Sequence, residues 1–189
     1  MAKFLGILSL TLGLALLAGC SVHEQHDQKS GDKKVDIQTP FGSIKVNTDA
    51  NAKDTGWPAY PGAQVKPSEG EGHDKSANVN ISGPFGAGVK VAVVEYLSDD
   101  PPEKVLGFYR SYMKTFGGQQ LECKNTAWNI HGRHGDDDEL RCDDSSHGDS
   151  VELKAGTKER QHIVAVKPSG KGSDFALVFV QVNGKEGVL

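Results

Sequence analysis

One histidine- and carboxylate-rich segment has the residue types best suited to metal chemistry. His131, His134 and Asp136 lie close together in the sequence, and further acidic residues follow. Imidazole and carboxylate groups bind divalent ions, and imidazole favours zinc, copper or nickel. Gly132 and Gly135 disfavour a helix that would place both imidazole rings on one face. We interpret the segment as a solvated loop between two cysteines, with weak metal binding as the alternative.

The patterns that would indicate catalysis are incomplete. Ser111 and Lys114 have the Ser-x-x-Lys spacing of serine β-lactamases, but the Ser-Asp-Asn and Lys-Thr-Gly partners are missing from the sequence. The glycine-rich stretches 83–88 and 170–172 lack the glycine order that holds a phosphate group. The cysteines form no Cys-x-x-Cys pair, which disfavours thiol oxidoreductase chemistry. The sequence therefore predicts neither an enzyme nor a cofactor.

The first residues of the chain have the layout of a secretory signal. Lys3 provides a positive charge, and an apolar stretch follows from Phe4 to Leu17. This stretch is shorter than the roughly 20 apolar residues that a membrane-spanning helix needs. The run Leu17-Ala18-Gly19-Cys20 that ends the segment resembles the lipobox of bacterial lipoproteins.

This resemblance implies a lipid anchor. Residues 1–19 would be cleaved, and Cys20 would become the acylated N-terminus of the mature protein. The lipid bilayer is then the expected partner, since each buried methylene contributes about 0.8 kcal/mol and two or more acyl chains anchor stably. Aspartate after the cysteine would resemble the inner-membrane retention signal of enterobacterial lipoproteins, but this chain has Ser21. We therefore expect an outer-membrane location facing the periplasm.

The other two cysteines are predicted to form a disulfide. With Cys20 acylated, Cys123 and Cys142 remain as an even pair in an oxidising compartment. A bond between them would close a loop of about 20 residues and stabilise the fold by about 3 kcal/mol in the chain-entropy model. Two buried free thiols are the alternative.

The charge balance disfavours nucleic acid as a partner. The chain has 21 Lys and Arg against 25 Asp and Glu, and cleavage after residue 19 would remove Lys3 and no acidic residue. Nucleic-acid binding requires a concentrated basic surface, which this mildly acidic chain lacks.

Composition divides the mature chain into three parts. Residues 20–34 are almost entirely polar, and they predict a lipidated, disordered tether. Residues 35–76 contain a hairpin pattern at 35–48 and a Pro- and Gly-rich loop segment. The remaining residues, 77–189, have the more regular pattern and predict a folded domain.

This domain is expected to belong to the α+β class. A helix is predicted at 101–116, with Asp100 as its N-cap and Glu103 completing a capping box. Strands are predicted at 79–81, 89–97, 119–124, 139–143, 150–155, 160–167 and 174–183. This order suits an antiparallel sheet with one amphipathic helix packed on a face. The elements Tyr60-Pro61-Gly62-Ala63 and Pro102-Glu103-Lys104-Val105, with Phe108-Tyr109, resemble uncharacterised bacterial exported proteins, which supports this fold and assigns no catalytic residue.

The expected function is that of an envelope lipoprotein acting as a non-enzymatic binding or interaction module for a protein or small ligand. One alternative is a metal-binding protein or metal-dependent envelope hydrolase that uses His131 and His134; another is a structural spacer. Phe41 and Phe85 each lie in a Pro-Phe-Gly turn. We expect each ring to pack onto the core, with an exposed anchor for a partner as the alternative.

Overall fold

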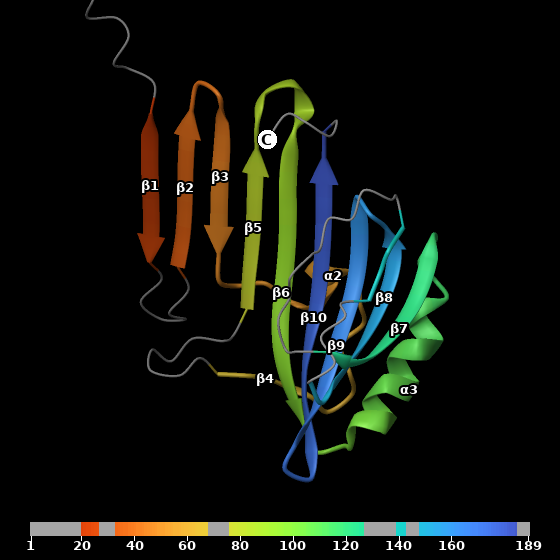
Figure 1. Cartoon of the computed structure of the whole chain (residues 1–189). Helices are drawn as coiled ribbons and strands as arrows, with labels where there is room; N and C mark the ends of the chain where they lie inside the picture. The colour runs from red at the N-terminus through yellow and green to blue at the C-terminus, as the bar shows by residue number, and fades with distance from the viewer. Residues whose placement is uncertain (1–19, 27–32, 68–75, 127–138, 143–147, 185–189) are drawn as a thin grey trace, which may run out of the picture.

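The protein folds around one large antiparallel sheet. The computed structural model describes residues 20–26, 33–67, 76–126, 139–142 and 148–184. Ten strands in this part of the chain form a sheet in the order β1-β2-β3-β5-β6-β10-β9-β8-β7, with β4 beside β6 (Figure 1). The strands are β1 (Ser21–His26), β2 (Lys33–Thr39), β3 (Gly42–Asn47), β4 (Gln64–Val65), β5 (Ser76–Ser82), β6 (Gly88–Ser98), β7 (Gln119–Thr126), β8 (Ser150–Thr157), β9 (Arg160–Ser169) and β10 (Gly172–Asn183). The helical elements are α2 (Ala52–Thr55), the 3-10 turn η1 (Pro84–Gly86) and α3 (Pro102–Met113).

Strands β6 and β10 form the centre of the sheet. They are 11 and 12 residues long and pair from Gly88 opposite Asn183 to Ser98 opposite Ser173. Their valines, phenylalanines and other β-forming residues suit a strand that has neighbours on both sides. Strand β5 covers one part of the free edge of β6, and β4 covers the part beyond it. The chain on either side therefore adds strands outward from this pair.

The expected α+β class is wrong, because the fold is β-rich and mostly antiparallel. Among the described residues, α3 is the single helix of seven or more residues. The sequence pattern underestimates the strand content in the N-terminal region. Strand β1 has the sequence SVHEQH, whose single apolar residue gives no alternation, but backbone pairing does not require apolar side chains.

The N-terminal strands extend the sheet instead of lying outside it. The predicted hairpin at 35–48 is confirmed as β2 and β3, which pair from Lys34 opposite Asn47 to Thr39 opposite Gly42. Strand β3 then pairs with β5, so the hairpin joins the main sheet. The sequence predicts a disordered tether at 20–34, whereas the structure places Ser21–His26 in β1, paired with β2. The anchor candidate Cys20 is thus followed directly by a strand.

The main core lies between the sheet and the segments around α2 and α3. Helix α3 contacts β8, β9 and β10, and α2 contacts β6 and β10 (Figure 1). Trp57 is 1% exposed and contacts Tyr109 of α3 edge-to-face at a centroid distance of 5.5 Å. Phe175 of β10 is fully buried and stacks on Tyr96 of β6 at 5.3 Å. Aromatic rings bury large apolar areas, and with the aliphatic side chains around them these rings form the core on this face.

Helix α3 begins differently from the sequence prediction. Its N-cap is Pro101, which makes no side-chain capping bond, and Glu103 instead pairs with Arg110. The carboxylate of Asp100 accepts hydrogen bonds from Lys104 Nζ and Tyr60 Oη, both at 2.8 Å. These two bonds lower the pKa of Asp100, and they tie the segment before β4 to the first turn of the helix.

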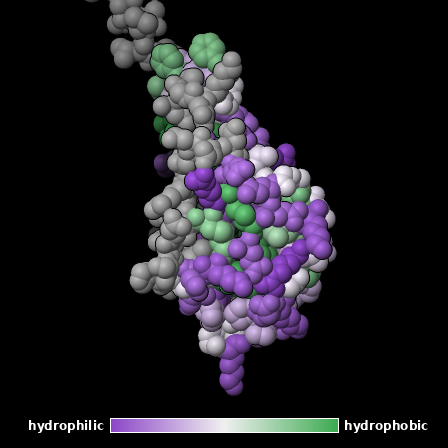
Figure 2. Space-filling model, turned by 45° about the vertical axis from the view of Figure 1, so that its right-hand side comes forward, coloured by the Kyte–Doolittle hydropathy of each residue, from purple (hydrophilic) through white to green (hydrophobic). Residues whose placement is uncertain are grey.

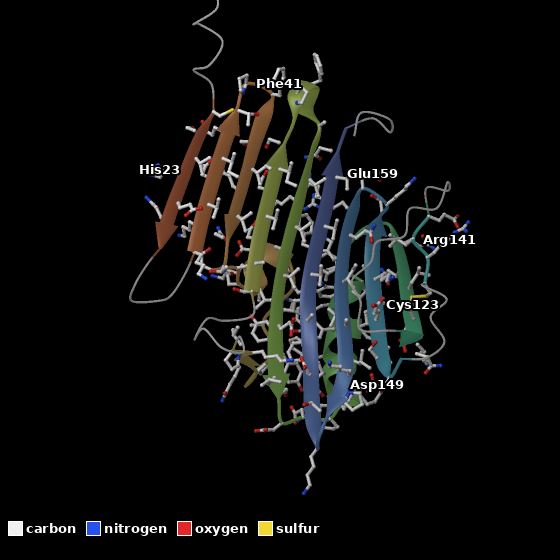
Figure 3. All side chains as sticks on the ribbon, turned by 60° about the vertical axis from the view of Figure 1, so that its left-hand side comes forward. His23, Phe41, Cys123, Arg141, Asp149 and Glu159 are labelled. Atoms are coloured by element: carbon white, nitrogen blue, oxygen red, sulfur yellow. A yellow bond between two sulfur atoms is a disulfide. The ribbon has the colours of Figure 1, made fainter. Side chains whose placement is uncertain are left out.

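The predicted disulfide between Cys123 and Cys142 is present, with a Cα–Cα distance of 5.4 Å. Cys123 lies in β7, an edge strand of the sheet (Figure 3). The described part of the expected strand at 139–143 is not a strand, although Leu140 is buried and its amide donates to the side chain of Gln119. The bond therefore fastens an irregular segment to an edge strand.

We expect the double variant Cys123→Ala/Cys142→Ala to lose about 3 kcal/mol of unfolding free energy, because the bond closes a loop across 19 positions. Urea denaturation, followed by tryptophan fluorescence, measures the loss. Reduction of the wild-type protein serves as the control and should give the same loss. An unchanged midpoint in both samples would show that the bond does not stabilise the fold.

His162 is buried in the core in its neutral form. Its Nδ1 lies 2.9 Å from the carbonyl oxygen of Thr55, so Nδ1 carries the proton and donates it to that oxygen. The ring stacks on Phe116 at 4.0 Å, and a Cβ on Gly56 would lie 2.8 Å from its Cε1. Burial lowers the pKa of His162, and the charge of Arg160 adds to this effect, although the bond to Thr55 opposes it.

This burial predicts a loss of stability in mild acid. Below the ordinary histidine pKa of 6.5, the unfolded chain binds a proton that folded His162 excludes, so the free energy of unfolding falls as the pH falls through this range. His162→Gln keeps a side-chain donor and removes the titration. We expect urea denaturation between pH 7.5 and 5.5 to show a smaller pH dependence in this variant. Equal pH dependence in the two proteins would contradict the assignment.

Candidate functional site

Cys20 lies at one end of the sheet, at the start of edge strand β1. Its sulfur is exposed and free, in contrast to the two cysteines in the disulfide. Ser21, the next residue, pairs with Gln38 of β2, one residue before Thr39 and the β2–β3 turn. Strand pairing therefore fixes Cys20 beside this turn.

The β2–β3 turn and the β5–β6 turn both lie at the same end of the sheet as Cys20. The register continues from β2 through β3 and β5 to β6, so the β2–β3 and β5–β6 turns lie beside each other (Figure 1). We call this end the uncharged rim, defined by residues 20–22, 37–44, 81–89 and 182–184. These positions contain no Asp, Glu, Lys, Arg or His. Because 24% of the chain is charged, about five charged residues would be expected in a set of this size.

The phenylalanine of each turn points away from the core, contrary to our expectation. Phe41 is 79% exposed and Phe85 is fully exposed, and Figure 3 shows Phe41 at the tip of its turn. Figure 2 shows apolar side chains at this tip of the molecule. Phe85 has φ 58° and ψ 22°, a left-handed conformation that is unfavourable for a bulky residue. The turn thus presents an apolar ring to the surroundings at a conformational cost.

Hydrogen bonds and a close approach order these two turns. The amide of Phe41 donates to Thr39 Oγ1 at 3.2 Å, and Thr39 Oγ1 donates to Gly42 O at 3.0 Å. The amide of Gly83 donates to Ala87 O at 2.7 Å. A Cβ at position 42 would lie 2.0 Å from the carbonyl oxygen of Ser82, so glycine is required where the two turns meet. The rings are therefore presented by fixed turns.

A polar hollow lies below the rim, on β1, β2 and β3. Its volume is about 490 Å³. It is lined by Ser21, His23, Gln25, Lys34, Val35, Asp36, Gln38, Lys45, Val46 and Asn47. Asp36 and Lys45 form an ion pair at 3.0 Å, but the Oδ1 atoms of Asp36 and Asn47 are buried and have no hydrogen-bond partner within the described part of the chain. Both oxygens therefore lie beneath the surface of the hollow, where a buried polar atom needs a hydrogen-bond donor.

A second group of charges lies near the opposite end of β6. Lys66 forms ion pairs with Asp174 of β10 and, at 3.4 Å, with Glu95 of β6. Burial alone would lower the pKa of Lys66, but these two carboxylates raise it above its usual value. Paired charges of this kind orient β4 and β10 relative to each other, and we assign them a structural role.

The predicted metal ligands His131, His134 and Asp136 lie outside the described residues. Within the described ranges, no group of three or more His, Cys, Asp or Glu side chains is placed to hold a metal ion. The same part of the chain contains no helix with the length and apolar character needed to cross a membrane. The described features that remain for function are Cys20, the uncharged rim and the polar hollow.

Comparisons with known proteins add no functional information. A scan of protein-family models, a search of curated proteins and a search of solved structures find no match. The functional proposals below therefore depend on the residues of this chain and their arrangement.

Two copies of one short motif in the sequence indicate the rim, but the sequence does not show that the copies lie close together. Pro-Phe-Gly occurs at 40–42 and again at 84–86, and uncharged residues flank both copies. Their proximity depends on the pairing of β3 with β5, a register that becomes visible only in the folded sheet. The hollow depends in the same way on β1, which the sequence predicts to be disordered.

We expect Phe41→Ser and Phe85→Ser each to change the unfolding free energy by less than about 0.5 kcal/mol, because both rings are exposed. Phe175→Ala is the matched control for a buried ring and should cost about 3–5 kcal/mol. Urea denaturation followed by tryptophan fluorescence measures all three. A loss above about 2 kcal/mol in either turn variant would show that its ring belongs to the core.

Proposed function

We propose that this chain is a bacterial envelope lipoprotein, anchored in the bilayer by acyl groups on Cys20. The observation that carries the proposal is the coincidence of two features at one cysteine. Cys20 ends the lipobox-like run Leu17-Ala18-Gly19-Cys20, and its free sulfur is exposed at an uncharged end of the sheet. Acyl chains attached there enter the bilayer without crossing a charged surface, so the anchor and the fold are compatible.

The proposed role of the anchored domain is non-enzymatic binding. The polar hollow on β1–β3 supports this proposal, because polar side chains line most of it and the Oδ1 atoms of Asp36 and Asn47 beneath it lack a donor among the described residues. Lys34 and Lys45 also line the hollow, and they are already paired with Asp49 at 2.9 Å and with Asp36 at 3.0 Å. The proposed ligand is therefore a polar molecule or protein segment that donates hydrogen bonds.

The proposed location is the periplasmic face of the outer membrane. Ser21 follows Cys20, in place of the aspartate that would resemble an inner-membrane retention signal. The disulfide between Cys123 and Cys142 fits this location, since such bonds persist in oxidising compartments.

We expect Cys20→Ser to release the protein from the membrane, because serine has no sulfur to accept the thioether-linked lipid. Fractionation of expressing cells should find the variant in the soluble fraction and the wild-type protein in the membrane. Mass spectrometry of the wild-type N-terminal peptide should show an acylated cysteine. The control is Cys123→Ala/Cys142→Ala, which removes the other two cysteines and should remain membrane-bound. A Cys20→Ser variant that stays in the membrane would refute the anchor.

A further inference from the structure

We propose that the uncharged rim inserts into the membrane interface, with the Phe41 and Phe85 rings entering the bilayer beside the acyl chains of Cys20. This inference rests on the proposed anchor, and it adds a second contact and an orientation. In this orientation the β2–β3 and β5–β6 turns face the membrane, and the strands of the N-terminal half extend away from it. The partner that covers the apolar tip is therefore the lipid bilayer.

The short connection between Cys20 and the sheet brings the rim to the membrane. Ser21 is already paired with Gln38, so no flexible residue separates the anchor position from the fold. Neighbouring strands lie about 4.8 Å apart, which places β6 within roughly 20 Å of β1 across the sheet. Acyl chains held in the bilayer at Cys20 therefore keep both phenylalanine turns near its surface.

The exposed apolar side chains are concentrated at this end of the molecule. Of the seven large apolar side chains that are exposed in the described part of the chain, five belong to the rim. They are Val22, Phe41, Ile44, Ile81 and Phe85. Val22, Ile44 and Ile81 lie in one cross-strand row, since each is linked through the register of β1, β2, β3 and β5. A row of this kind beneath two protruding rings forms an apolar tip that lipid can cover.

Membrane entry also requires that polar groups in the tip have partners or remain near the headgroups. The amide of Phe41 donates to the Thr39 hydroxyl, and the amides of Gly83 and Ala87 donate to backbone carbonyls within their turn. These bonds satisfy amides that would otherwise be costly to bury in an apolar medium.

Among the described residues, the charged residues nearest to the rim are Asp36, Lys45 and Lys90, one residue away, and Glu24, two residues away; Lys185, which follows position 184, lies outside the described part of the chain. Glu24 lies two residues below Val22, a distance of about 7 Å along the strand. Asp36, Lys45 and Lys90 lie in the next cross-strand row, one residue or about 3.4 Å below the row of Val22, Ile44 and Ile81. The β2–β3 and β5–β6 turns extend beyond the row of apolar side chains, so insertion of the turns to a depth of about 5–10 Å leaves these charges at the headgroup level.

The experiment uses the acylated full chain, purified from bacterial membranes and reconstituted into phosphatidylcholine vesicles with or without brominated acyl chains. Phe41→Trp and Phe85→Trp each place a fluorophore in one turn, and bromine atoms quench tryptophan that is in contact with the lipid chains. The wild-type protein gives the background from Trp57 and Trp128. Tyr112→Trp is the matched control, because Tyr112 is also an exposed aromatic residue but lies on α3, away from the rim.

We expect the tryptophan introduced in each turn to emit at shorter wavelength in vesicles and to be quenched in the brominated vesicles, after the wild-type background is subtracted. We expect Tyr112→Trp to show neither change. Flotation of the vesicles and the mass of the N-terminal peptide are measured on the same samples. If the protein is acylated and floats but the turn tryptophans are unquenched, the inference is overturned and the anchor stands; turns that bind a protein partner give this result. If Cys20 carries no lipid and the protein does not float, the proposed anchor is overturned and the inference with it.

Vesicle binding by variants that lack one of the two phenylalanine rings tests the same contact without an introduced fluorophore. Burial of one phenylalanine ring contributes about tenfold to partitioning. We therefore expect unacylated Cys20→Ser protein to lose about tenfold in vesicle binding with Phe85→Ser, and a similar factor with Phe41→Ser. Equal vesicle binding by all three proteins would contradict insertion of the rings, whatever the state of Cys20 in the natural protein.

Discussion

Antiparallel pairing outward from β6 and β10 is the constraint on which the rest of the structure depends. The position of each added strand along its axis is set by its register with the strand before it. The register of β5 on β6 therefore sets the positions of β3, β2 and finally β1. A shift of one residue at any of these steps would invert the side chains of that strand relative to its neighbours. The register therefore decides that Cys20 and the two Pro-Phe-Gly turns lie at one end.

The same sheet provides two different environments. Along β8, β9 and β10, one face is covered by α3 and the aromatic residues around Trp57, and this half contains the packed core. Strands β1, β2 and β3 have no fully buried side chain in the described part. They are stabilised mainly by backbone hydrogen bonds and by surface ion pairs, which contribute little individually. The half with the proposed anchor and hollow is thus the less stable half, as is common for binding elements.

The sequence predicts the regular parts of this structure and misses the parts that depend on long-range pairing. The helix, the β2–β3 hairpin and most strands follow from local periodicity, and the disulfide follows from cysteine number and the inferred compartment. The sequence does not predict strand β1, because its side chains are polar and its stability comes from pairing with β2. Exposed aromatic rings are uncommon, so the sequence favours a core position for Phe41 and Phe85; the folded turns instead point both rings outward. The signal for Cys20 is local in the sequence, whereas the rim and the hollow combine residues from several strands.

Cys20 is joined to a folded strand, so the proposed lipid anchor on Cys20 would hold the sheet itself at the membrane. Hydrogen exchange of the acylated protein in vesicles, resolved by mass spectrometry of peptides, tests this claim most directly. We predict that peptides covering Ser21–His26 retain slowly exchanging amides, as Lys33–Thr39 does, because β1 and β2 share a ladder of backbone hydrogen bonds. Exchange of residues 21–26 at the rate of an unstructured peptide would show that β1 is a tether and would contradict the fixed orientation.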